Sequence, residues 1–447
     1  MNIESSLDNE VAIIGLGYVG LTLGVALADV GIKVVGLEVR SDIVSLTNSG
    51  IPHFKEKGLS VALSRLVGTG LMCATEDTKD IANATAFFIT VGTPLNGKGE
   101  IDLQSIKNAS HQVASVMPEN SIIIFRSTMK VGTARNIVKP IIESYRKKFQ
   151  LAVCPERTLE GKALEELRYL PQIVGGFDKA ATDRAGKIFG RITQKIVPVS
   201  SPETAEVVKL VDNTYRDIQF AFGNEVAGLC NVLDGVHAGE VIRLGKMDYA
   251  RTNVAMPGLV GGPCLSKDPH ILNQSAEATG TTMSVTLASR AINEAMPSVA
   301  ADFIVNRLKS EEGIVVTIAG FAFKGKPETD DLRGSMSIDF MNAFQAAAPN
   351  AVINIFDPIV KIKDLQEFSE NCFDNFKESI ADSTVLVICN NHEFFSSIDL
   401  QSILIKHTKI KMIYDFWNHF DYLDASQKKA LRYVTYGNHW LFSEQTT

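Results

Sequence analysis

The sequence has few cysteines and histidines, and neither residue type falls into a pattern that binds a metal. Its six cysteines are scattered over 447 residues, without a Cys-x-x-Cys pair or a zinc-type spacing. This distribution is typical of a protein of the reducing cytoplasm and excludes a disulfide framework. The eight histidines form no His-Glu-x-x-His motif. The sequence therefore predicts a cytoplasmic protein without a metal site.

The chain also lacks an excess of positive charge. It has 44 Lys and Arg against 51 Asp and Glu, a net charge of −7. A nucleic-acid-binding protein would show a basic face, so no nucleic acid is expected as a partner. Residues 11–28 carry no charge and just reach the length of a membrane span. Acidic residues precede this segment and four glycines interrupt it, so we expect a buried strand, a turn and a helix rather than membrane insertion.

Length and composition predict a globular protein of several domains. The chain is 45% hydrophobic and 21% charged, which excludes disorder and a coiled coil. Its length suggests about three domains. Short apolar runs alternate with helical patterns before residue 200 and again after residue 313. Such alternation predicts doubly wound α/β sheets of parallel strands.

The predicted strands are short apolar runs. In the first region they lie at 11–15, 33–37, 85–91, 121–125 and 151–154, and in the last at 314–323, 352–358, 384–390, 412–417 and 433–437. Helical patterns cover 103–116, 133–147 and 284–308, and Ser201 with Pro202 marks another helix start. We predict two Rossmann-like domains, 1–200 and 311–447, joined by a long central helix in a helical region at 201–310.

A glycine motif follows the first predicted strand. Gly15, Gly17 and Gly20 form a GxGxxG pattern, with Tyr18 and Val19 inside it. The first glycine permits a tight turn, the second lets the backbone approach a pyrophosphate, and the third allows close helix–strand packing. The helix N-terminus then holds the pyrophosphate. A turn that binds nothing, and a site for FAD or another dinucleotide, remain alternatives.

The second predicted strand ends at an acidic residue. Glu38 lies 18 residues after Gly20, where a carboxylate accepts hydrogen bonds from ribose hydroxyls. A carboxylate there repels a 2′-phosphate, which favours NAD over NADP. Arg40, two residues later, weakens this discrimination.

Polar residues follow three further strands. Thr93 and Thr128 lie just after strands, and Glu156, Arg157 and Glu160 follow the strand at 151–154. The carboxyl ends of parallel strands line the crevice where a ligand binds. Each segment alone could be an ordinary charged turn, but their joint placement favours one binding edge.

One cysteine lies in a segment that suits a nucleophile. Cys264 follows two glycines and a proline, and Lys267 and Asp268 come directly after it. Such a backbone can approach a ligand closely, and a nearby cation favours the thiolate, which is the nucleophile. A buried structural thiol is the alternative.

Two further pairs of polar residues have a suggestive spacing. Lys209 and Asn213 are four residues apart, hence on one helix face. Lys324 and Arg333 follow the first strand of the last region, where cations suit phosphate contacts. Solvated surface residues are the alternative for both pairs.

Six ordered segments of the chain together resemble the UDP-glucose/GDP-mannose dehydrogenase family of nucleotide-sugar 6-dehydrogenases. They lie at 15–20, 127–133, 154–161, 206–213, 261–268 and 321–335. The resemblance implies a fold of two Rossmann-like domains with a long central helix that builds a homodimer. It also implies NAD as cofactor and a UDP-sugar as substrate, for surface polysaccharide synthesis.

The resemblance further implies a four-electron oxidation of the sugar C6 alcohol to a carboxylate with two NAD⁺. Cys264 would capture the intermediate aldehyde as a thiohemiacetal, which a second oxidation turns into a thioester for hydrolysis. Lys209 and Asn213 would stabilise the oxyanion. Asp268 would assist proton transfer or hold a water, and Glu156 would assist hydrolysis or the first deprotonation.

The remaining matched positions would contact the ligands. Thr128 would position the water, Glu160 and Gly261 would line the substrate site, and Lys267 would support the Cys264 loop. Lys324 would contact the nucleotide sugar. Arg333 would reach the cofactor phosphates or tie the domains together.

One departure from the commoner family pattern bears on the sugar. The family usually has Asn-Pro-Glu-Phe where this chain has Cys-Pro-Glu-Arg at 154–157. The variant resembles the branch acting on UDP-N-acetylhexosamines, especially N-acetylmannosamine, and Arg157 would donate to the acetamido carbonyl. Arg251 is the candidate for an arginine that some members contribute from the neighbouring subunit. A UDP-glucose 6-dehydrogenase, a two-electron Rossmann dehydrogenase and a non-catalytic nucleotide-sugar sensor are the alternatives.

Overall fold

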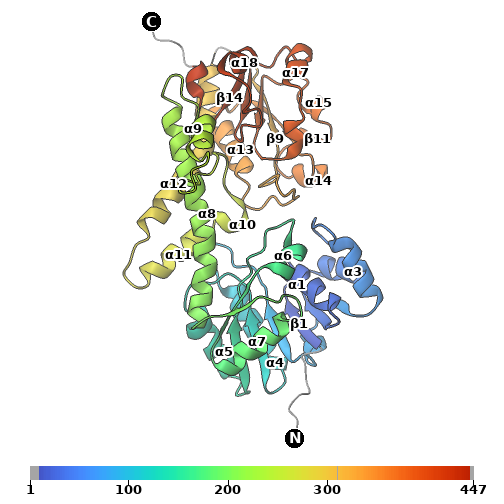
Figure 1. The fold of residues 1–447 in the computed structure, drawn as a ribbon. Coiled ribbons are helices and arrows are strands. Elements are labelled where there is room, and N and C mark those ends of the chain that lie inside the picture. Colours follow the sequence, from blue (N-terminus) through green and yellow to red (C-terminus); the bar gives the residue numbers. More distant parts are fainter. Residues whose placement is uncertain (1–9, 310, 443–447) are drawn as a thin grey trace. The chain divides into compact units, whose positions relative to one another are not determined.

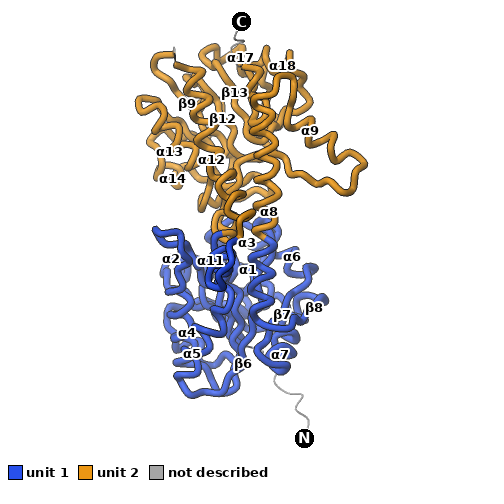
Figure 2. The backbone as a smooth tube through the Cα atoms, turned by 90° about the vertical axis from the view of Figure 1, so that its left-hand side faces the viewer, with its two compact units in different colours: residues 1–212, 270–282 blue, residues 213–269, 283–447 orange. Residues whose placement is uncertain are grey.

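The computed structural model describes residues 10–309 and 311–442. The chain forms two compact units (Figure 2). The first extends to Asp212 and also includes His270–Thr282; the second comprises Asn213–Pro269 and the chain from Met283 onward. Each unit has its own sheet and its own hydrophobic cores.

The first unit is built on an eight-stranded sheet. In chain order its strands are β1 (Glu10–Ile14), β2 (Lys33–Leu37), β3 (Met72–Thr75), β4 (Ala86–Ile89), β5 (Ser121–Phe125), β6 (Phe149–Val153), β7 (Gln172–Gly176) and β8 (Ile196–Pro198). Their order in the sheet is β3-β2-β1-β4-β5-β6-β7-β8, and only β6 and β7 pair antiparallel among the described strands. The strand order reverses between β1 and β4, the place where open α/β sheets bind ligands.

Helices cover both faces of this sheet (Figure 1). Side chains of one strand alternate between two cores: Val11 and Ile13 face one, Ala12 and Ile14 the other. The first core includes α1 (Tyr18–Asp29), α3 (Leu59–Gly68) and α7 (Lys179–Phe189); the second includes α4 (Gln104–Val116) and α5 (Lys139–Glu143). Two short helices, α2 (Ser41–Asn48) and α6 (Ala163–Tyr169), also belong to this unit.

The second unit repeats this plan with a six-stranded, all-parallel sheet. Its strands are β9 (Val315–Ala319), β10 (Val352–Phe356), β11 (Cys372–Phe373), β12 (Val385–Ile388), β13 (Met412–Asp415) and β14 (Tyr433–Thr435), in the order β11-β10-β9-β12-β13-β14. One core includes α12 (Ser284–Arg307) and α13 (Met336–Ala347); the other includes α15 (Phe376–Ser379), α16 (Glu393–Ser396) and α17 (Leu400–Lys406).

The long helix α8 (Pro202–Cys230) begins where the sequence predicts it. The Ser201 hydroxyl accepts a hydrogen bond from the Thr204 backbone N–H at 3.1 Å, as an N-cap does. The remaining helices of the second half include α9 (Ala238–Gly245), α10 (Gly262–Leu265), α11 (Asp268–Glu277), α14 (Ile362–Leu365) and α18 (Ala425–Ala430). No helix of the described residues is both long and apolar enough to cross a membrane.

The predicted fold class, two Rossmann-like sheets and a long central helix, is confirmed. Every strand that the sequence predicts is present, and six of the ten are shorter than predicted, by two to five residues. The predicted helix at 133–147 is a π-helical segment, η2 (Ala134–Val138), followed by α5. The division into three domains stays a prediction.

Candidate active site

The glycine motif forms a tight turn between β1 and α1 in the first unit. Gly15 has a φ of +90° and donates its backbone N–H to the Leu37 carbonyl at 2.8 Å. A Cβ atom on Gly20 would lie 1.9 Å from the Gly15 carbonyl oxygen, whereas one on Gly17 would meet nothing within 4 Å. Gly15 and Gly20 are thus required by the backbone, and Gly17 leaves open space for a ligand, as a pyrophosphate needs.

The Glu38 carboxylate is fixed at the end of β2. It is buried, and it accepts hydrogen bonds from the backbone N–H groups of Leu16 at 2.8 Å, Val39 at 2.9 Å and Arg40 at 3.1 Å. The Arg40 guanidinium instead pairs with Asp42 at 2.6 Å. The Glu38 carboxylate is therefore held in a fixed position at the end of β2, where it can accept hydrogen bonds from ribose hydroxyls. The Arg40 guanidinium is paired with Asp42 and is not available for a 2′-phosphate, so the arrangement fits NAD.

Threonines tie together the loops that follow β1, β4 and β5. The Thr90 hydroxyl donates to the carbonyl oxygens of Ile14 at 2.9 Å and Gly15 at 2.7 Å. The Thr93 hydroxyl donates to the Thr128 carbonyl oxygen at 2.8 Å. The predicted residues Thr93 and Thr128 are thus neighbours at the carboxyl edge of the sheet, beside the glycine turn.

Glu156 follows β6 and is the centre of a buried polar cluster. Its Oε1 accepts hydrogen bonds from the backbone N–H groups of Arg157 at 2.8 Å and Thr158 at 2.7 Å, and its Oε2 contacts the Arg126 guanidinium in a buried ion pair. Burial raises the pKa of Glu156, but the positive charges of Arg126 and Lys209 and the hydrogen bonds outweigh it, so the net pKa lies below its ordinary value. Glu156 is therefore a fixed anion near Lys209.

The other charged residues of this loop are engaged within the first unit. Arg157 pairs with Asp212 at 3.2 Å and donates to the Pro171 carbonyl oxygen at 2.7 Å. Its predicted contact with an acetamido group stays a prediction. Glu160 is half-buried in the same loop.

Tyr18 joins the glycine-motif helix to this loop. Its hydroxyl contacts the Glu56 carboxylate and accepts a hydrogen bond from the Gly161 backbone N–H at 2.9 Å. Burial and the Glu56 carboxylate raise the pKa of Tyr18 well above its ordinary value. The phenol is therefore neutral and holds the 156–161 loop against α1.

In the second unit, the predicted residues Asn213 and Asp268 are in direct contact. The Asn213 side-chain amide donates to the Asp268 carboxylate at 2.6 Å, and both side chains are buried. Cys264 lies on the short helix α10, four residues before Asp268, and it is exposed. Cys154, in contrast, is buried, and burial raises the pKa of its thiol to about 12, which leaves that thiol unreactive.

Close backbone contacts shape the loop that carries Cys264. Gly262 has a φ of +89° and donates its N–H to the Gly334 carbonyl oxygen at 2.7 Å. A Cβ atom on Gly261 would lie 2.3 Å from the same oxygen, and one on Gly262 would lie 2.4 Å from the Phe323 ring. The Cys264 loop therefore packs against the segment 323–334, which carries Lys324 and Arg333.

The remaining predicted cations are held by neighbours in the second unit. The Lys324 ammonium lies 5.1 Å from the centre of the Phe323 ring. Arg333 pairs with Asp331 at 2.6 Å, and Arg251 lies 4.7 Å from the centre of the Tyr249 ring. Lys267 is half-buried in the Cys264 loop. The roles that the sequence analysis gave to these residues stay predictions.

A buried network that was not predicted from the sequence supports the Cys264 loop. Arg290 on α12 pairs with Asp217 on α8 at 2.6 Å and donates to the Leu265 carbonyl oxygen at 3.1 Å. Asn293 donates to Asp217 at 2.8 Å. The spacing of polar residues on α8 could have indicated this network. Asp217 lies four residues after Asn213, so the two residues share one helix face.

A second missed residue is Glu206 on α8. Its carboxylate accepts hydrogen bonds from the backbone N–H groups of Gly132 at 2.6 Å and Ala134 at 3.0 Å. Burial raises the pKa of Glu206 to about 7, although these hydrogen bonds lower it. Glu206 thus anchors the helix that bears Lys209 to the segment after Thr128.

Family comparison covers nearly the whole chain. Residues 9–193 match the UDP-glucose/GDP-mannose dehydrogenase family, NAD binding domain; 203–295 match its central domain and 317–422 its UDP binding domain. A UDP-N-acetyl-D-mannosamine dehydrogenase of Pyrococcus horikoshii is 31% identical, covering 88% of this chain and 92% of its own length. A Campylobacter jejuni enzyme of the same name is 32% identical over 79% of this chain and 87% of its own length.

Solved structures agree with this assignment. The structure of the Pyrococcus horikoshii UDP-N-acetyl-D-mannosamine dehydrogenase superposes with a TM-score of 0.86 at 29% identity, covering 96% of this chain and 99% of that chain. A UDP-glucose dehydrogenase from Pyrobaculum islandicum has a TM-score of 0.85 at 25% identity, covering 98% and 100%. The chain therefore belongs to the UDP-glucose/GDP-mannose dehydrogenase family and is an NAD-dependent nucleotide-sugar dehydrogenase whose substrate is a UDP-sugar.

Proposed function

We propose that the enzyme oxidises the C6 alcohol of a UDP-N-acetylhexosamine, of the N-acetylmannosamine type, to the carboxylate in a four-electron reaction. The observation that carries this proposal is Cys264, an exposed thiol on a loop whose backbone is shaped by Gly261 and Gly262. Cys264 lies four residues before Asp268, which forms a buried hydrogen bond with Asn213. A two-electron alcohol dehydrogenase needs no such nucleophile. The sugar assignment is supported by the named relatives and by Arg157 in the 154–157 segment.

The glycine turn and Glu38 would hold the cofactor, with Thr93, Thr128, Tyr18 and Val19 beside it. When bound, NAD⁺ accepts the hydride in each of the two oxidations. Gly17 leaves open space where the pyrophosphate would lie, and the Glu38 carboxylate would accept hydrogen bonds from the ribose hydroxyls. The Arg333 side chain, which is largely exposed, would contact the cofactor phosphates.

Cys264 would make the reaction a four-electron one. Its thiolate adds to the C6 aldehyde, forming a C–S bond and an alkoxide that takes up a proton. The resulting thiohemiacetal still carries one C6–H, so a second hydride can leave to NAD⁺ while the hydroxyl loses its proton to water, and a thioester forms. Water then adds to the thioester carbon, the C–S bond breaks, and the acid and the thiolate are released.

Lys209, Asn213 and Asp268 would stabilise the charges of these steps. Lys209 and Asn213 lie one turn apart on α8, so the helix fixes an ammonium and an amide donor for the developing oxyanion. Asp268 accepts from the Asn213 amide, which fixes the orientation of that amide, and would move a proton to or from water. Lys267 would support the Cys264 loop.

Glu156 would act in hydrolysis as a fixed hydrogen-bond acceptor for the attacking water. Its pairing with Arg126 keeps it ionised, which supports orientation of water more than proton uptake. Thr128 would position the same water. Glu160, Gly261 and Lys324 would line the substrate site.

A homodimer built on α8 is part of this proposal. Exposed apolar side chains recur on α8 at intervals of four, seven and seven residues, namely Val211, Tyr215, Phe222 and Leu229. These intervals place them on one helix face, and an exposed apolar stripe marks an interaction site. Arg251 would reach the partner's substrate.

All six cysteines lie in the described residues as thiols, which suits work in the cytoplasm.

The decisive experiment compares Cys264→Ala with wild type by product analysis. We expect the variant to make no uronate, because the aldehyde cannot be captured. Cys73→Ala, which changes another exposed thiol, should leave acid formation intact. Full acid formation by Cys264→Ala would show that the reaction does not proceed through a covalent intermediate on Cys264.

The sugar is tested by NADH production with a panel of UDP-sugars. We expect kcat/KM to be highest for UDP-N-acetylmannosamine among the N-acetylhexosamine and hexose substrates. A higher value for UDP-glucose would instead assign a UDP-glucose 6-dehydrogenase, and nucleotide-sugar binding without turnover of any substrate would indicate a sensor.

A further inference from the structure

The Asn224 side chain on α8 holds the backbone of Gly258, six residues before Cys264. Its Oδ1 accepts a hydrogen bond from the Gly258 N–H at 3.0 Å, and its Nδ2 donates to the Gly258 carbonyl oxygen at 3.2 Å. Asn224 is only 1% exposed. A side-chain amide that pairs with both backbone groups of one residue satisfies them and fixes the position of that residue.

A second buried asparagine, Asn293 on α12, sets the orientation of the Asn224 amide. Asn224 Nδ2 also donates to Asn293 Oδ1 at 2.9 Å, and Asn293 Nδ2 donates to the Asp217 carboxylate at 2.8 Å. A carboxylate in an ion pair accepts hydrogen bonds and does not donate, so Asp217 determines which end of the Asn293 amide faces it. Asn293 then determines which end of the Asn224 amide faces Gly258.

The same network reaches the backbone directly after Cys264. Arg290, which pairs with Asp217, donates to the Leu265 carbonyl oxygen at 3.1 Å. The chain is therefore held at Gly258 and at Leu265, and Cys264 lies between these two points. A satisfied buried network is rigid, so it restricts the positions that the thiol can take.

The Trp417 side chain contacts Gly258 as well. A Cβ atom on Gly258 would lie 2.9 Å from three atoms of the Trp417 indole, so the ring leaves no room for a side chain there. The indole N–H donates to the Cys389 carbonyl oxygen, just after β12, at 2.9 Å. Gly258 is thus in contact with α8 and with the segment that follows β13.

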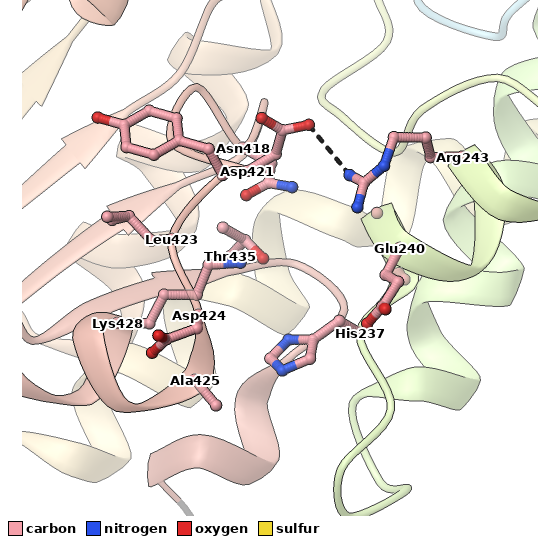
Figure 3. A pocket seen from close by; sticks show the side chains of 13 residues that line it. His237, Glu240, Arg243, Asn418, Asp421, Leu423, Asp424, Ala425, Lys428 and Thr435 are labelled. Atoms are coloured by element: carbon pink, nitrogen blue, oxygen red, sulfur yellow. Dashed lines mark hydrogen bonds and ion pairs between the residues drawn. The ribbon is translucent and has the colours of Figure 1, made fainter.

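The segment that carries Trp417 is itself attached to neighbouring elements. The Trp417 backbone N–H donates to the Asp415 carboxylate, at the end of β13, at 2.9 Å. Four residues after Trp417, Asp421 forms an ion pair with Arg243 on α9 at 3.2 Å, drawn as a dashed line in Figure 3. Trp417 is therefore a fixed support for Gly258.

We propose that Asn224 is a positioning residue, which keeps the Cys264 thiol within reach of the C6 aldehyde so that the aldehyde is captured before it dissociates. This inference rests on the proposed four-electron reaction. A small displacement of the sulfur slows formation of the C–S bond, whereas release of the aldehyde does not require the sulfur. Loss of the contact between Asn224 and Gly258 should therefore change which product leaves the enzyme.

The test measures the ratio of free aldehyde to uronate formed by wild type and by Asn224→Ala, with UDP-N-acetylmannosamine and, in parallel, UDP-glucose. Products formed early in the reaction are separated from the enzyme, the aldehyde is converted to its oxime, and both are counted by mass spectrometry. We expect wild type to release uronate with about two NADH per sugar. Asn224→Ala should raise the ratio at least tenfold and lower the NADH yield toward one. Partial unfolding changes the amount of active enzyme but not this ratio.

Asn354→Ala is the matched control. Asn354 is also buried in the second unit, and its amide donates to the Ser379 carbonyl oxygen at 2.9 Å. The substitution should lower stability and leave the product ratio at the wild-type value.

A second variant, Gly258→Ala, guards against misfolding of Asn224→Ala. It adds one methyl group that meets the Trp417 ring, so the segment before Cys264 must shift, and it leaves no polar side chain unpaired. Its product ratio should rise as well.

A wild-type product ratio in Asn224→Ala, or an equal rise in Asn354→Ala, would overturn the positioning role while the four-electron reaction stands. One NADH per sugar and free aldehyde from wild type would overturn the four-electron reaction and this inference with it. The two failures are distinguished by the product of the wild type.

Discussion

Arg126 and Glu156 form a buried ion pair where β5 and β6 end, next to the proposed cofactor and substrate sites. Sequence placed Glu156 at a sheet edge, because strand ends are visible as the ends of apolar runs. It did not reveal that Arg126 turns inward to meet it, since one charged residue after a strand looks like any other. Which residue pairs with a buried charge depends on how the strands and loops pack in three dimensions, and this packing cannot be read from a single sequence.

The first prediction concerns this ion pair. Arg126→Met leaves the Glu156 carboxylate buried without its cation, so we expect a loss of about 3–5 kcal/mol in the free energy of unfolding at pH 7. Urea unfolding followed by circular dichroism measures it. Arg135→Met, which breaks the exposed ion pair with Glu203, should cost about 1 kcal/mol or less. Equal effects of the two variants would show that burial does not set the strength of the pair.

The pH dependence of this effect has a definite sign. Because the folded pKa of Glu156 lies below its ordinary value of 4.5, its stabilising contribution is present above pH 4.5 and is lost as pH falls through the folded pKa. The stability difference between wild type and Arg126→Met should therefore shrink below pH 4.5. A difference that grows in acid would contradict the assignment.

At the scale of elements, α8 is anchored to the rest of the first unit by Glu206. Its folded pKa of about 7 exceeds the ordinary value of 4.5, so the protonated carboxyl favours the folded state. That contribution is complete below pH 4.5 and is lost as pH rises to about 7, at up to about 1.4 kcal/mol per pH unit. We predict that Glu206→Gln lacks this slope when unfolding is measured between pH 4.5 and 8.

Glu203→Gln is the matched control, because it lies one turn earlier on α8. The hydrogen bond with Arg135 lowers the pKa of Glu203 despite some burial, so its removal should not affect the slope between pH 4.5 and 7. A wild-type slope that persists in Glu206→Gln would mean that another group titrates there.

The Cys264 loop depends on the network of Asp217, Arg290 and Asn293. Arg290→Met leaves Asp217 buried without its cation and removes a donor from the Leu265 carbonyl oxygen. We predict a fall in kcat of at least tenfold with a small change in KM, and a loss of about 3–5 kcal/mol in stability. Tryptophan fluorescence can follow the unfolding, since Trp417 and Trp440 both lie in the second unit. Arg216→Met, an exposed neighbour on α8, should change neither quantity; a similar effect there would contradict a specific role of the network.

The strands that sequence patterns missed are short, partly exposed or end in glycines. β11 has two residues, and β8 has three, which are largely exposed. β3 alternates buried and exposed residues over only four positions, and β7 ends in two glycines. None of them gives the continuous apolar run that marks a central parallel strand. The helix at 133–147 was predicted as one element because hydrophobic periodicity does not show the π-helical turn of η2.

At the scale of the whole molecule, the six strands of the second sheet have the same relative order as the first six strands of the first sheet, and both sheets hold their first turn in the same way. Asp357 after β10 accepts the backbone N–H groups of Phe321 at 2.7 Å and Ala322 at 2.9 Å, as Glu38 after β2 accepts that of Leu16. The repeated alternation of apolar runs was enough to predict both sheets. It could not assign residues to compact units, because long-range contacts decide that α8 is shared between them.

Assembly is the prediction at this scale. Phe222→Glu places a charge in the apolar stripe of α8, so we expect the proposed dimer to become a monomer in sedimentation velocity experiments. Ile405→Glu, a similarly exposed site on α17, should leave the assembly unchanged. A wild-type monomer, or a dimer that survives Phe222→Glu, would contradict a dimer built on α8.

The most direct test counts NADH formed per molecule of UDP-sugar consumed. The account predicts about two, because the aldehyde stays bound to Cys264 and loses a second hydride there before water releases the acid. A ratio of one, with free aldehyde as the product, would contradict it.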